Sequence, residues 1–262
     1  MSSDINDLLL YEEINEIAVL TLNRPKRQNA LSSDLMNKIL DKLNDIERNK
    51  NIKAVTIFGN GNNFCAGHDL KELKMDKSEE RFKHLFELCS KLMLKIVKLP
   101  KPVIAGVQGI ATAAGCQLVA SCDLALAADN AKFATPGVNI GLFCSTPMVA
   151  VSRNVNRKET MEMLLLGEFV TPSKAREIGL INKVVPNENL KQETMKIAQI
   201  IALKSPSTVA IGKEAFYKQL EMNIEDAYKY TSKVMSTNML KKDAQEGISA
   251  FLENRDPKWS DK

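Results

Sequence analysis

The segment GIATAAGCQLVASCDLALAA, residues 109–128, begins with a run of small residues and continues as an ordinary apolar segment. The segment KPVIAGVQG, residues 101–109, leads into these small residues; it is apolar and predicts a strand. The small residues then lead into a predicted helix from about Ala114 to Cys122, and the LALAA and AKFA that follow predict further strands. Strands and helices that alternate in this way are typical of an α/β architecture.

The same alternation extends toward the amino terminus. Residues 8–13 and 17–22 are apolar, β-branched runs around a short turn, which predicts a hairpin. Ser32 or Ser33 is suited to cap the helix that follows, because apolar residues recur there at helical spacing. The remaining elements predicted in this half are a strand at 54–59, a loop over NGNNFCAGHDLKEL and an amphipathic helix at 78–98.

From about Thr146 the pattern becomes helical. Thr171 followed by Pro172 predicts a cap with proline at the first helical position, and KVV at 183–185 is the one short strand. The predicted helices cover about 157–166, 172–178, 190–204, 207–219, 223–236 and 240–254. We therefore expect a core over residues 1–205 and a helical carboxyl-terminal region over 206–262, packed on the core or on a partner subunit.

The composition is that of a soluble globular protein, with 44% apolar and 26% charged residues in a chain of 262. No apolar run approaches the length of about 18 residues that suggests a membrane span. Charges of both signs alternate around a net charge of +4 without a basic block, which argues against a nucleic-acid partner. The amino terminus does not resemble a signal peptide, so cytoplasmic is the default expectation; the mitochondrial matrix stays open if a transit peptide has been removed.

The cysteines and histidines argue against a metal site. The five cysteines include no CxxC pair, and their apolar contexts predict reduced, mostly buried thiols. His68 and His84 have no acidic or thiol cluster at ligand spacing. We therefore expect no metal and no separate cofactor.

Two glycine-containing loops, FCAGHDLKEL and GIATAAGCQ, contain the residues that suggest chemistry. Each is expected where a strand gives way to a helix, and a helix start offers unpaired backbone NH groups and the positive end of the helix dipole. One NH group from each loop would form an oxyanion hole, and small side chains would let a carbonyl approach the main chain. Tight helix-to-strand packing explains the same small residues, and the loops alone leave both interpretations open.

In combination, the motifs of the chain resemble the crotonase, or enoyl-CoA hydratase/isomerase, superfamily over almost its whole length. The resemblance implies an α/β fold, a spiral of ββα units with carboxyl-terminal helices that mediate trimer formation, often as a dimer of trimers. It also implies an acyl-CoA thioester ligand, with coenzyme A as part of the substrate. The matching motifs are LNRPKRQNAL, FCAGHDLKEL, KPVIAGVQGIATAAGCQLVASCDLALA, FATPGVNIGL, LLLGEFVTPSKAREIGLINKVVP and EGISAFLENR.

The resemblance also implies roles for particular residues. The two oxyanion NH groups would be those of His68 and Ala114, and the side chain of His68, unusual in that slot, is expected to play a positional role rather than act as acid or base. Asp69 is expected to order the loop or cap the following helix. The positions implied for the CoA and substrate side are Lys26, Ala30, Ala66, Gly67, Asp69, Leu70 and Lys71, with Phe251 and Lys258 as candidates from a neighbouring subunit. Lysines suit the phosphates through charge-assisted hydrogen bonds, although a solvated surface charge is the better explanation for each lysine taken alone.

The chain departs from the hydratase pattern where the carboxylates belong. Typical hydratases have one glutamate directly after the GC pair and a second in the segment that reads TPGVNIG here; this chain has Gln117 and Gly137 at those catalytic positions. A glutamine amide orients a water but does not exchange protons near neutral pH, and glycine has no side chain. Asn254 stands where the pattern tends to have lysine, which puts the phosphate contact from a neighbouring subunit in doubt.

Cys144, Ser145 and His68 are the candidates to substitute for the missing carboxylates. Cys144 and Ser145 follow Gly137 by seven and eight residues, but no base beside Cys144 can be identified, so we expect a buried small side chain rather than a nucleophile. Asp123 in the SCD motif is expected to be a cap or a buried hydrogen-bond acceptor.

The sequence therefore favours an acyl-CoA-binding enzyme, nominally an enoyl-CoA hydratase/isomerase of fatty acid metabolism, that stabilises a thioester enolate. General acid/base catalysis contributes roughly 10²–10⁴ to a rate and an oxyanion donor about 10²–10³. Ligand binding is accordingly expected to survive better than hydration. The alternative is a non-catalytic acyl-CoA-binding regulatory protein.

Overall fold

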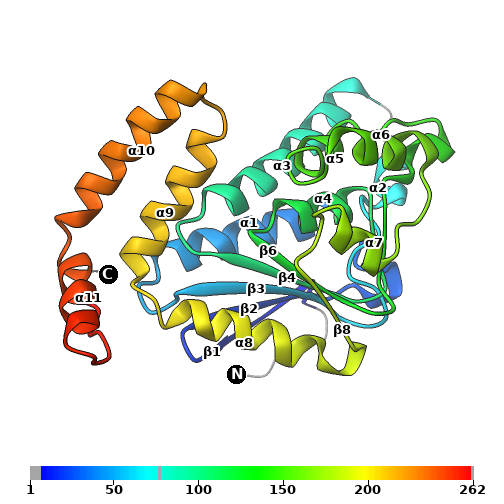
Figure 1. Ribbon diagram of the computed structural model, residues 1–262. Coiled ribbons are helices and arrows are strands. Elements are labelled where there is room, and N and C mark those ends of the chain that lie inside the picture. Colours follow the sequence, from blue (N-terminus) through cyan, green and yellow to red (C-terminus); the bar gives the residue numbers. More distant parts are fainter. Residues whose placement is uncertain (1–6, 76–77, 261–262) are drawn as a thin grey trace.

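The computed structural model describes residues 7–75 and 78–260, and its centre is a twisted, mostly parallel sheet (Figure 1). The sheet has the order β1-β2-β3-β4-β6-β8, in which only β1 and β2 pair antiparallel. Its strands are β1 (Leu9–Ile14), β2 (Ile17–Leu22), β3 (Ala54–Gly59), β4 (Val103–Val107), β6 (Leu124–Ala128) and β8 (Lys183–Val185). A second, two-stranded parallel sheet pairs β5 (Ile110–Thr112) with β7 (Lys132–Ala134).

Helices cover both faces of the large sheet (Figure 1). On β2, Ala18, Leu20 and Leu22 lie in the apolar cluster formed with α1 (Ser33–Arg48), α3 (Glu79–Lys98) and α4 (Ala114–Ser121). Ile17 and Val19 point to the other face, where α8 (Leu190–Ala202) packs. This alternation follows from the two-residue period of a strand, and burial on both faces explains why these strands read as continuous apolar runs.

The first helix shows how local sequence defines an element. The Ser32 hydroxyl accepts a hydrogen bond from the backbone NH of Leu35 at 3.3 Å, so Ser32 is the cap, as expected. Six apolar side chains spaced at three and four residues face the sheet and are buried. The helix ends at Arg48, where the polar run of residues 48–51 begins.

Short helices and 3₁₀ turns lie between these larger elements, next to the loops of interest. They are α2 (Leu70–Met75), α5 (Pro147–Val151), α6 (Arg157–Leu166), α7 (Pro172–Glu177) and the 3₁₀ turns η1 (Pro25–Arg27), η2 (Pro136–Ile140) and η3 (Asn187–Asn189). Two expectations are corrected here. The segment LKEL (residues 70–73) was predicted as loop but lies in α2. The strand predicted from KPVIAGVQG stops at Val107, and Ile110–Thr112 belongs to the second sheet.

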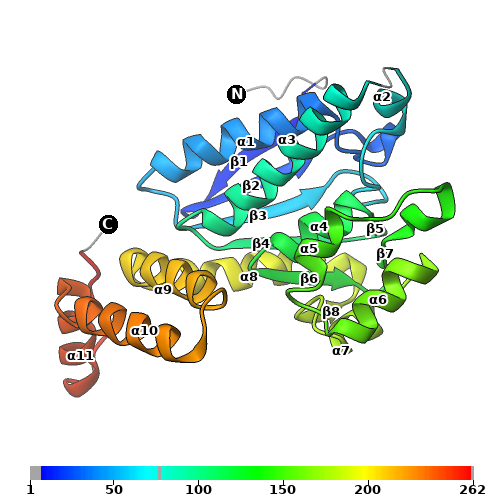
Figure 2. The ribbon, with the colours of Figure 1, turned by 90° about the horizontal axis from the view of Figure 1, so that it is seen from above.

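Three carboxyl-terminal helices extend from one end of the molecule; the first lies against the core and the other two stand apart from the sheet (Figures 1 and 2). They are α9 (Pro206–Gln219), α10 (Ile224–Met239) and α11 (Lys242–Leu252), close to the predicted ranges. Large apolar side chains on this region are exposed, among them Ile224, Leu240 and Phe251. The segment that follows α11 packs on this region as far as Ser260, and the Trp259 indole NH donates to the carbonyl of Leu203 at 2.8 Å.

Candidate active site

The second small-residue loop ends in a strained residue that begins a helix. Ala113 has φ 50° and ψ −118°, a conformation that costs a non-glycine residue about 1–3 kcal/mol. Its own NH donates to the carbonyl of Ala134 at 2.9 Å. Helix α4 begins at the next residue, Ala114. The NH of a first helical residue has no acceptor within its own helix, so the Ala114 NH makes no intrahelical hydrogen bond. This NH is the donor that the sequence predicts.

The first loop presents a second NH group in a different way. The NH of Leu31 donates to the carbonyl of Gly67 at 2.7 Å, and the NH of Asp69 donates to the carbonyl of Leu31 at 3.2 Å. These two hydrogen bonds pair Leu31 with His68 as in parallel strands. The backbone NH and carbonyl groups of successive residues in an extended chain point to opposite sides, so the NH and carbonyl of His68 point away from Leu31. His68 precedes α2 by two residues, so the expectation of a helix-start NH holds for Ala114 and is wrong for His68.

The two loops are in direct contact. Gly67 has φ +93°, and a Cβ at this position would lie 3.0 Å from the Ala113 Cβ and 3.4 Å from the Ala114 nitrogen. On the other side, a Cβ at Gly115 would lie 2.1 Å from the carbonyl oxygen of Cys65. The glycines are therefore required for close approach of the two main chains, and His68 follows directly on the residue that touches Ala114.

The imidazole of His68 is buried against α3. Its ring lies edge-on to Phe86, with 5.4 Å between ring centroids. Both ring nitrogens are buried without a hydrogen-bond partner among residues 7–75 and 78–260. Burial lowers the pKa of His68, so the ring is neutral near pH 7.

Gln117 lies one turn after Ala114 and is 4% exposed. Its side-chain oxygen faces the Cys89 thiol at 3.8 Å, and the residue forms part of the wall of a large cavity. An amide in this position offers a donor and an acceptor without charge.

Gly137 is closely surrounded by the loop that follows it. A Cβ here would lie 2.8 Å from the carbonyl oxygen of Leu142 and 2.9 Å from Sγ of Cys144. The Gly137 NH donates to that sulfur at 3.3 Å. Burial raises the pKa of the Cys144 thiol, which argues against a ready nucleophile, while Ser145 donates its hydroxyl to the carbonyl of Phe143 at 3.4 Å.

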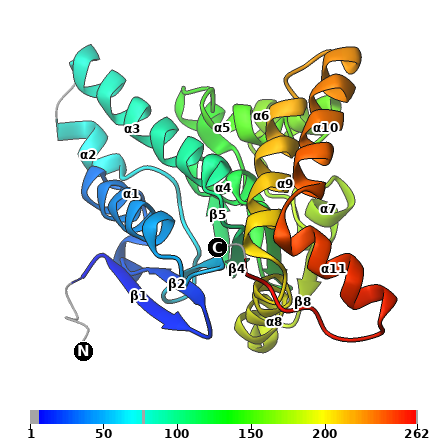
Figure 3. The ribbon, with the colours of Figure 1, turned by 90° about the vertical axis from the view of Figure 1, so that its left-hand side faces the viewer.

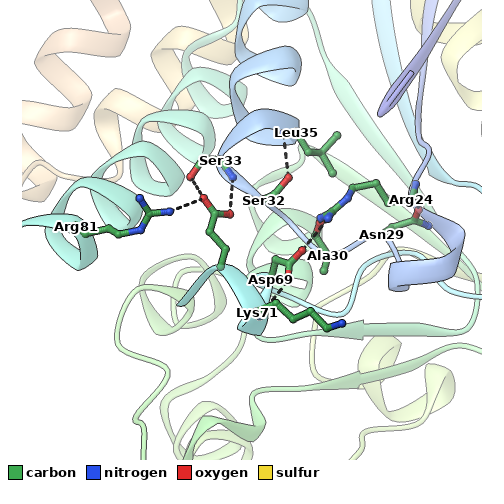
Figure 4. Close-up of polar contacts among 10 residues, drawn as sticks. Arg24, Asn29, Ala30, Ser32, Ser33, Leu35, Asp69, Lys71 and Arg81 are labelled. Atoms are coloured by element: carbon green, nitrogen blue, oxygen red, sulfur yellow. Dashed lines mark hydrogen bonds and ion pairs between the residues drawn. The ribbon is translucent and has the colours of Figure 1, made fainter. Parts of the chain in front are cut away.

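Asp69 holds the first loop in place (Figure 4). Its carboxylate accepts from the Arg24 guanidinium at 2.7 Å and from the NH of Lys71 at 3.1 Å, which makes it the cap of α2. Burial opposes its ionisation, but these hydrogen bonds outweigh burial and lower the pKa of Asp69 below its ordinary value. Arg24 also donates to the carbonyl of Ala30, so one guanidinium connects the two segments.

Two further residues, which the sequence analysis did not single out, also hold the first loop and the segments beside it in place. Asn29 is fully buried with φ +53°; its amide donates to the carbonyls of Asn60 and Asn63, and its side-chain oxygen accepts from the NH of Arg24. Glu72 accepts from the NH and hydroxyl of Ser33 and forms an ion pair with Arg81 at 3.5 Å (Figure 4). The sequence signal for Asn29 is its residue type: asparagine adopts the left-handed conformation more readily than most residues, and it follows the NRP turn here. This signal was not used in the sequence analysis.

Asp123 is a hydrogen-bond acceptor, as expected, but its side chain is 15% exposed and therefore only partly buried. Its carboxylate accepts from the Val103 NH at 2.7 Å, from the Lys213 ammonium at 2.6 Å and from the Tyr217 hydroxyl at 2.9 Å. Lys213 donates further to the carbonyls of Ile96 and Lys101. This network attaches α9 to the core.

The residues expected to bind CoA fall into two groups. Lys26, Leu70 and Lys71 are exposed. Ala30 lies between η1 and α1, and Ala66 and Gly67 lie in the first loop. Phe251 and Lys258 belong to α11 and the tail after it, and all three ribbon views place α11 at the far end of the molecule from α2 (Figures 1–3). One chain therefore does not bring the two groups together.

The family follows from comparison with known proteins. Residues 12–262 match the model of the enoyl-CoA hydratase/isomerase family. The chain belongs to this family, and the crotonase fold inferred from its motifs is confirmed.

Relatives and solved structures cover nearly the whole chain. It is 46% identical to enoyl-CoA hydratase domain-containing protein 3, mitochondrial, of Xenopus laevis, over 97% of this chain and 86% of that protein. It is 47% identical to the human protein of the same name, over 95% and 82%. A crystal structure titled enoyl-CoA hydratase of Mycobacterium smegmatis matches with a TM-score of 0.95 at 47% identity, over 97% of this chain and 99% of that one. The human domain-containing protein 3 structure matches with a TM-score of 0.94 at 45% identity, over 97% and 100%.

Among the residues that the structure describes, no helix is long and apolar enough to cross a membrane. Within the same part of the chain, no three His, Cys, Asp or Glu side chains gather as metal ligands. The five cysteines are buried and free.

Proposed function

We propose that the protein binds an acyl-CoA thioester and polarises its carbonyl with the NH groups of His68 and Ala114. The contact of Gly67 with Ala113 and Ala114 carries this proposal, because it brings the two NH-bearing residues to one place. Such donors stabilise the negative charge of an enolate oxygen, which is the step that hydration and isomerisation share.

Hydration of an enoyl thioester is expected to be weak. Neither Gln117 nor Gly137 transfers a proton, and Gly137 has no room for a side chain beside Cys144 and Leu142. Crotonyl-CoA turnover tests this directly. A rate within about tenfold of a glutamate-bearing relative refutes the argument, since two lost acid/base groups are worth at least about 10².

A non-catalytic acyl-CoA-binding protein is the second candidate. The lack of a carboxylate at both positions and the raised pKa of the Cys144 thiol favour it. Calorimetry with enoyl, dienoyl, malonyl and hydroxyacyl thioesters separates the two candidates. Tight binding with no product supports the binding protein; product that is lost on replacing Gln117 or His68 supports the enzyme.

For the assembly we propose a homotrimer or a dimer of trimers. The exposed apolar side chains of α10 and α11 support it, and so does the distance of α11 from the loops of its own chain. In such an assembly, Phe251 and Lys258 would reach the CoA of a neighbour. Sedimentation equilibrium gives the mass, and a monomer would overturn this proposal.

For the compartment, the names of the relatives favour the mitochondrion over the cytoplasmic default. The Xenopus and human proteins are both named mitochondrial. Cell fractionation with an antibody to the chain separates the two compartments.

A further inference from the structure

The side-chain amide of Gln117 is held in one orientation by a neighbouring thiol. Gln117 lies on α4 and Cys89 on α3, two helices that pack side by side (Figure 3). The Cys89 thiol donates to the side-chain oxygen of Gln117 at 3.8 Å. Cys89 is fully buried, and burial raises the pKa of its thiol to about 12, so the sulfur keeps its hydrogen near pH 7. A thiol hydrogen pairs with the oxygen of an amide and not with its NH₂ group, so the Gln117 oxygen faces α3.

The amide nitrogen of Gln117 keeps both of its hydrogens available for a ligand. Within residues 7–75 and 78–260, no group accepts a hydrogen bond from this nitrogen. Unlike the ring nitrogens of His68, it is not sealed from the space around it. That space is the cavity of about 860 Å³ between α3, α4, α5 and α9, which Gln117 lines. Gln117 therefore presents a neutral donor to the cavity.

The neighbouring polar side chains have already used their hydrogens. The hydroxyls of Ser90 and Ser121 each donate at 2.8 Å to the carbonyl one turn earlier in their own helix. The Asn154 amide donates to two main-chain carbonyls, at 2.8 and 2.9 Å. All three side chains line the same cavity. Gln117 differs from them because its donor has no partner in the described part of the protein.

Gln117 also lies beside the proposed oxyanion donor. Ala114 and Gln117 are three residues apart and therefore lie on the same side of α4. At 1.5 Å per residue, the axial distance between them is about 4.5 Å. A thioester whose carbonyl accepts from the Ala114 NH thus places the first carbons of its acyl chain next to the Gln117 amide.

The acceptor that suits this donor follows from its chemistry. A buried NH₂ group left without a partner is costly, so an acyl chain with no oxygen beside it binds less well. A carboxylate would bring a charge that the neutral amide does not balance. A hydroxyl can accept, but its own hydrogen then competes with the Cys89 thiol for the Gln117 oxygen. A ketone oxygen accepts and brings no hydrogen.

We infer that Gln117 makes the site specific for 3-oxoacyl-CoA thioesters, with its NH₂ group as the donor to the ketone oxygen at C3 and Cys89 as the residue that positions the amide. This inference rests on the proposed function of the same site and names the class of ligand. A site built to hydrogen-bond one group of a ligand discriminates strongly against an analogue that lacks the group.

Calorimetry on the full chain tests the inference with three thioesters of four carbons, so that chain length is constant. Acetoacetyl-, 3-hydroxybutyryl- and butyryl-CoA carry a ketone, a hydroxyl and no oxygen at C3. Acetoacetyl-CoA is expected to bind at least about tenfold more tightly than butyryl-CoA, because butyryl-CoA leaves the buried donor unpaired. The affinity of 3-hydroxybutyryl-CoA is expected to fall between the two.

Replacing the amide gives the matched comparison. Gln117→Met removes the donor and keeps the length of the side chain, so acetoacetyl-CoA affinity should fall to that of butyryl-CoA while butyryl-CoA affinity stays unchanged. Gln117→Leu serves in the same way if Gln117→Met fails to fold. Ser90→Ala is the control, because it removes a polar group from the wall of the same cavity whose hydrogen is bound to its own helix, and it should keep the preference.

Cys89→Ala tests the positioning of the amide. Without the thiol, the amide can turn its oxygen toward the cavity and accept from a hydroxyl. The ratio of acetoacetyl-CoA to 3-hydroxybutyryl-CoA affinity should therefore fall by about two- to threefold, the lower range for one net hydrogen bond. A cysteine that only packs would shift both affinities together.

The outcomes separate this inference from the proposed function. The inference is overturned by equal affinities for acetoacetyl- and butyryl-CoA, by a preference that survives the loss of the Gln117 amide, or by an unchanged ratio in Cys89→Ala. Each of these results leaves the proposed function in place. Equal losses of acetoacetyl- and butyryl-CoA affinity in Gln117→Met would assign Gln117 to packing and also overturn the inference. Binding of no acyl-CoA at all overturns both.

Discussion

The Cys144 sulfur occupies the space that a side chain on Gly137 would need, 2.9 Å from the position of its Cβ. The NH of Gly137 donates to the same sulfur, so the two residues are matched to one another. The loss of the second hydratase carboxylate is thus more than a change of one residue. Restoring glutamate at position 137 would require the loop of Leu142 and Cys144 to move.

Gly137→Ala should destabilise the protein by about 1–3 kcal/mol, because the new methyl overpacks a closed site. Adding Cys144→Ala should recover part of that loss, and the Leu142 carbonyl should prevent full recovery. Urea unfolding of the single and double variants measures the coupling. Gly212→Ala is the control: nothing lies within 4 Å of a Cβ there, so it should not destabilise. Additive single effects would contradict the proposed fit.

Gly67→Ala should weaken acyl-CoA binding more than it weakens the fold. Its φ of +93° costs alanine about 1 kcal/mol, and the methyl would crowd Ala113 and the Ala114 NH. Gly141→Ala has the same kind of strain, at φ +77°, with open space around the methyl. The two variants should therefore lose similar stability, and only Gly67→Ala should lose affinity for butyryl-CoA by calorimetry. Equal butyryl-CoA affinities of the two variants would show that Gly67 does not contribute to the acyl-CoA site.

Lys213→Met should destabilise the fold by about 3–5 kcal/mol, since it leaves the Asp123 carboxylate without its cation. Burial lowers the pKa of Lys213, and the neighbouring carboxylate only partly opposes this effect. Glu221→Gln removes an ion pair with Arg153 whose side chains are more than half exposed, and should change little. Thermal unfolding compares them, and similar melting temperatures would refute a structural role for the buried pair.

His68 should make the fold less stable in mild acid. Because burial lowers its pKa in the folded state, the unfolded chain takes up a proton below about pH 6.5 that the folded chain does not. Stability contributed by the neutral ring is therefore present above that pH and is lost as pH falls toward the folded-state pKa. His68→Gln should flatten the pH profile of the melting temperature between about 6.5 and 5, whereas His84→Gln, on the exposed side of α3, should leave it unchanged. A profile that His68→Gln does not alter would show that the pKa of His68 is the same in the folded and unfolded chains, and would refute the effect of burial.

Local patterns predicted most of the fold because its elements are regular. The cap at Ser32, the continuous apolar strands and the spacing of α9 to α11 are properties of neighbouring residues. The short α2 and α5 escaped prediction because one or two turns give little periodicity.

The site was predicted only in part. The small residues around Gly67 and Ala114 left two interpretations open, approach of a ligand carbonyl and tight packing. The structure shows tight packing between these loops. The cation for Asp123 comes from Lys213, 90 residues away, and no local pattern reports such a pairing. Nor did the sequence indicate that the thiol of Cys144 would fill the space beside Gly137.

The only tryptophan of the chain, Trp259, is held between the carbonyl of Leu203 and Gly247 of α11. Its fluorescence is therefore a built-in reporter of the carboxyl-terminal helices and of nothing in the sheet. Emission and far-UV circular dichroism followed in one denaturant titration would show whether those helices detach before the rest unfolds. Two midpoints would mean that they melt as a separate cooperative unit.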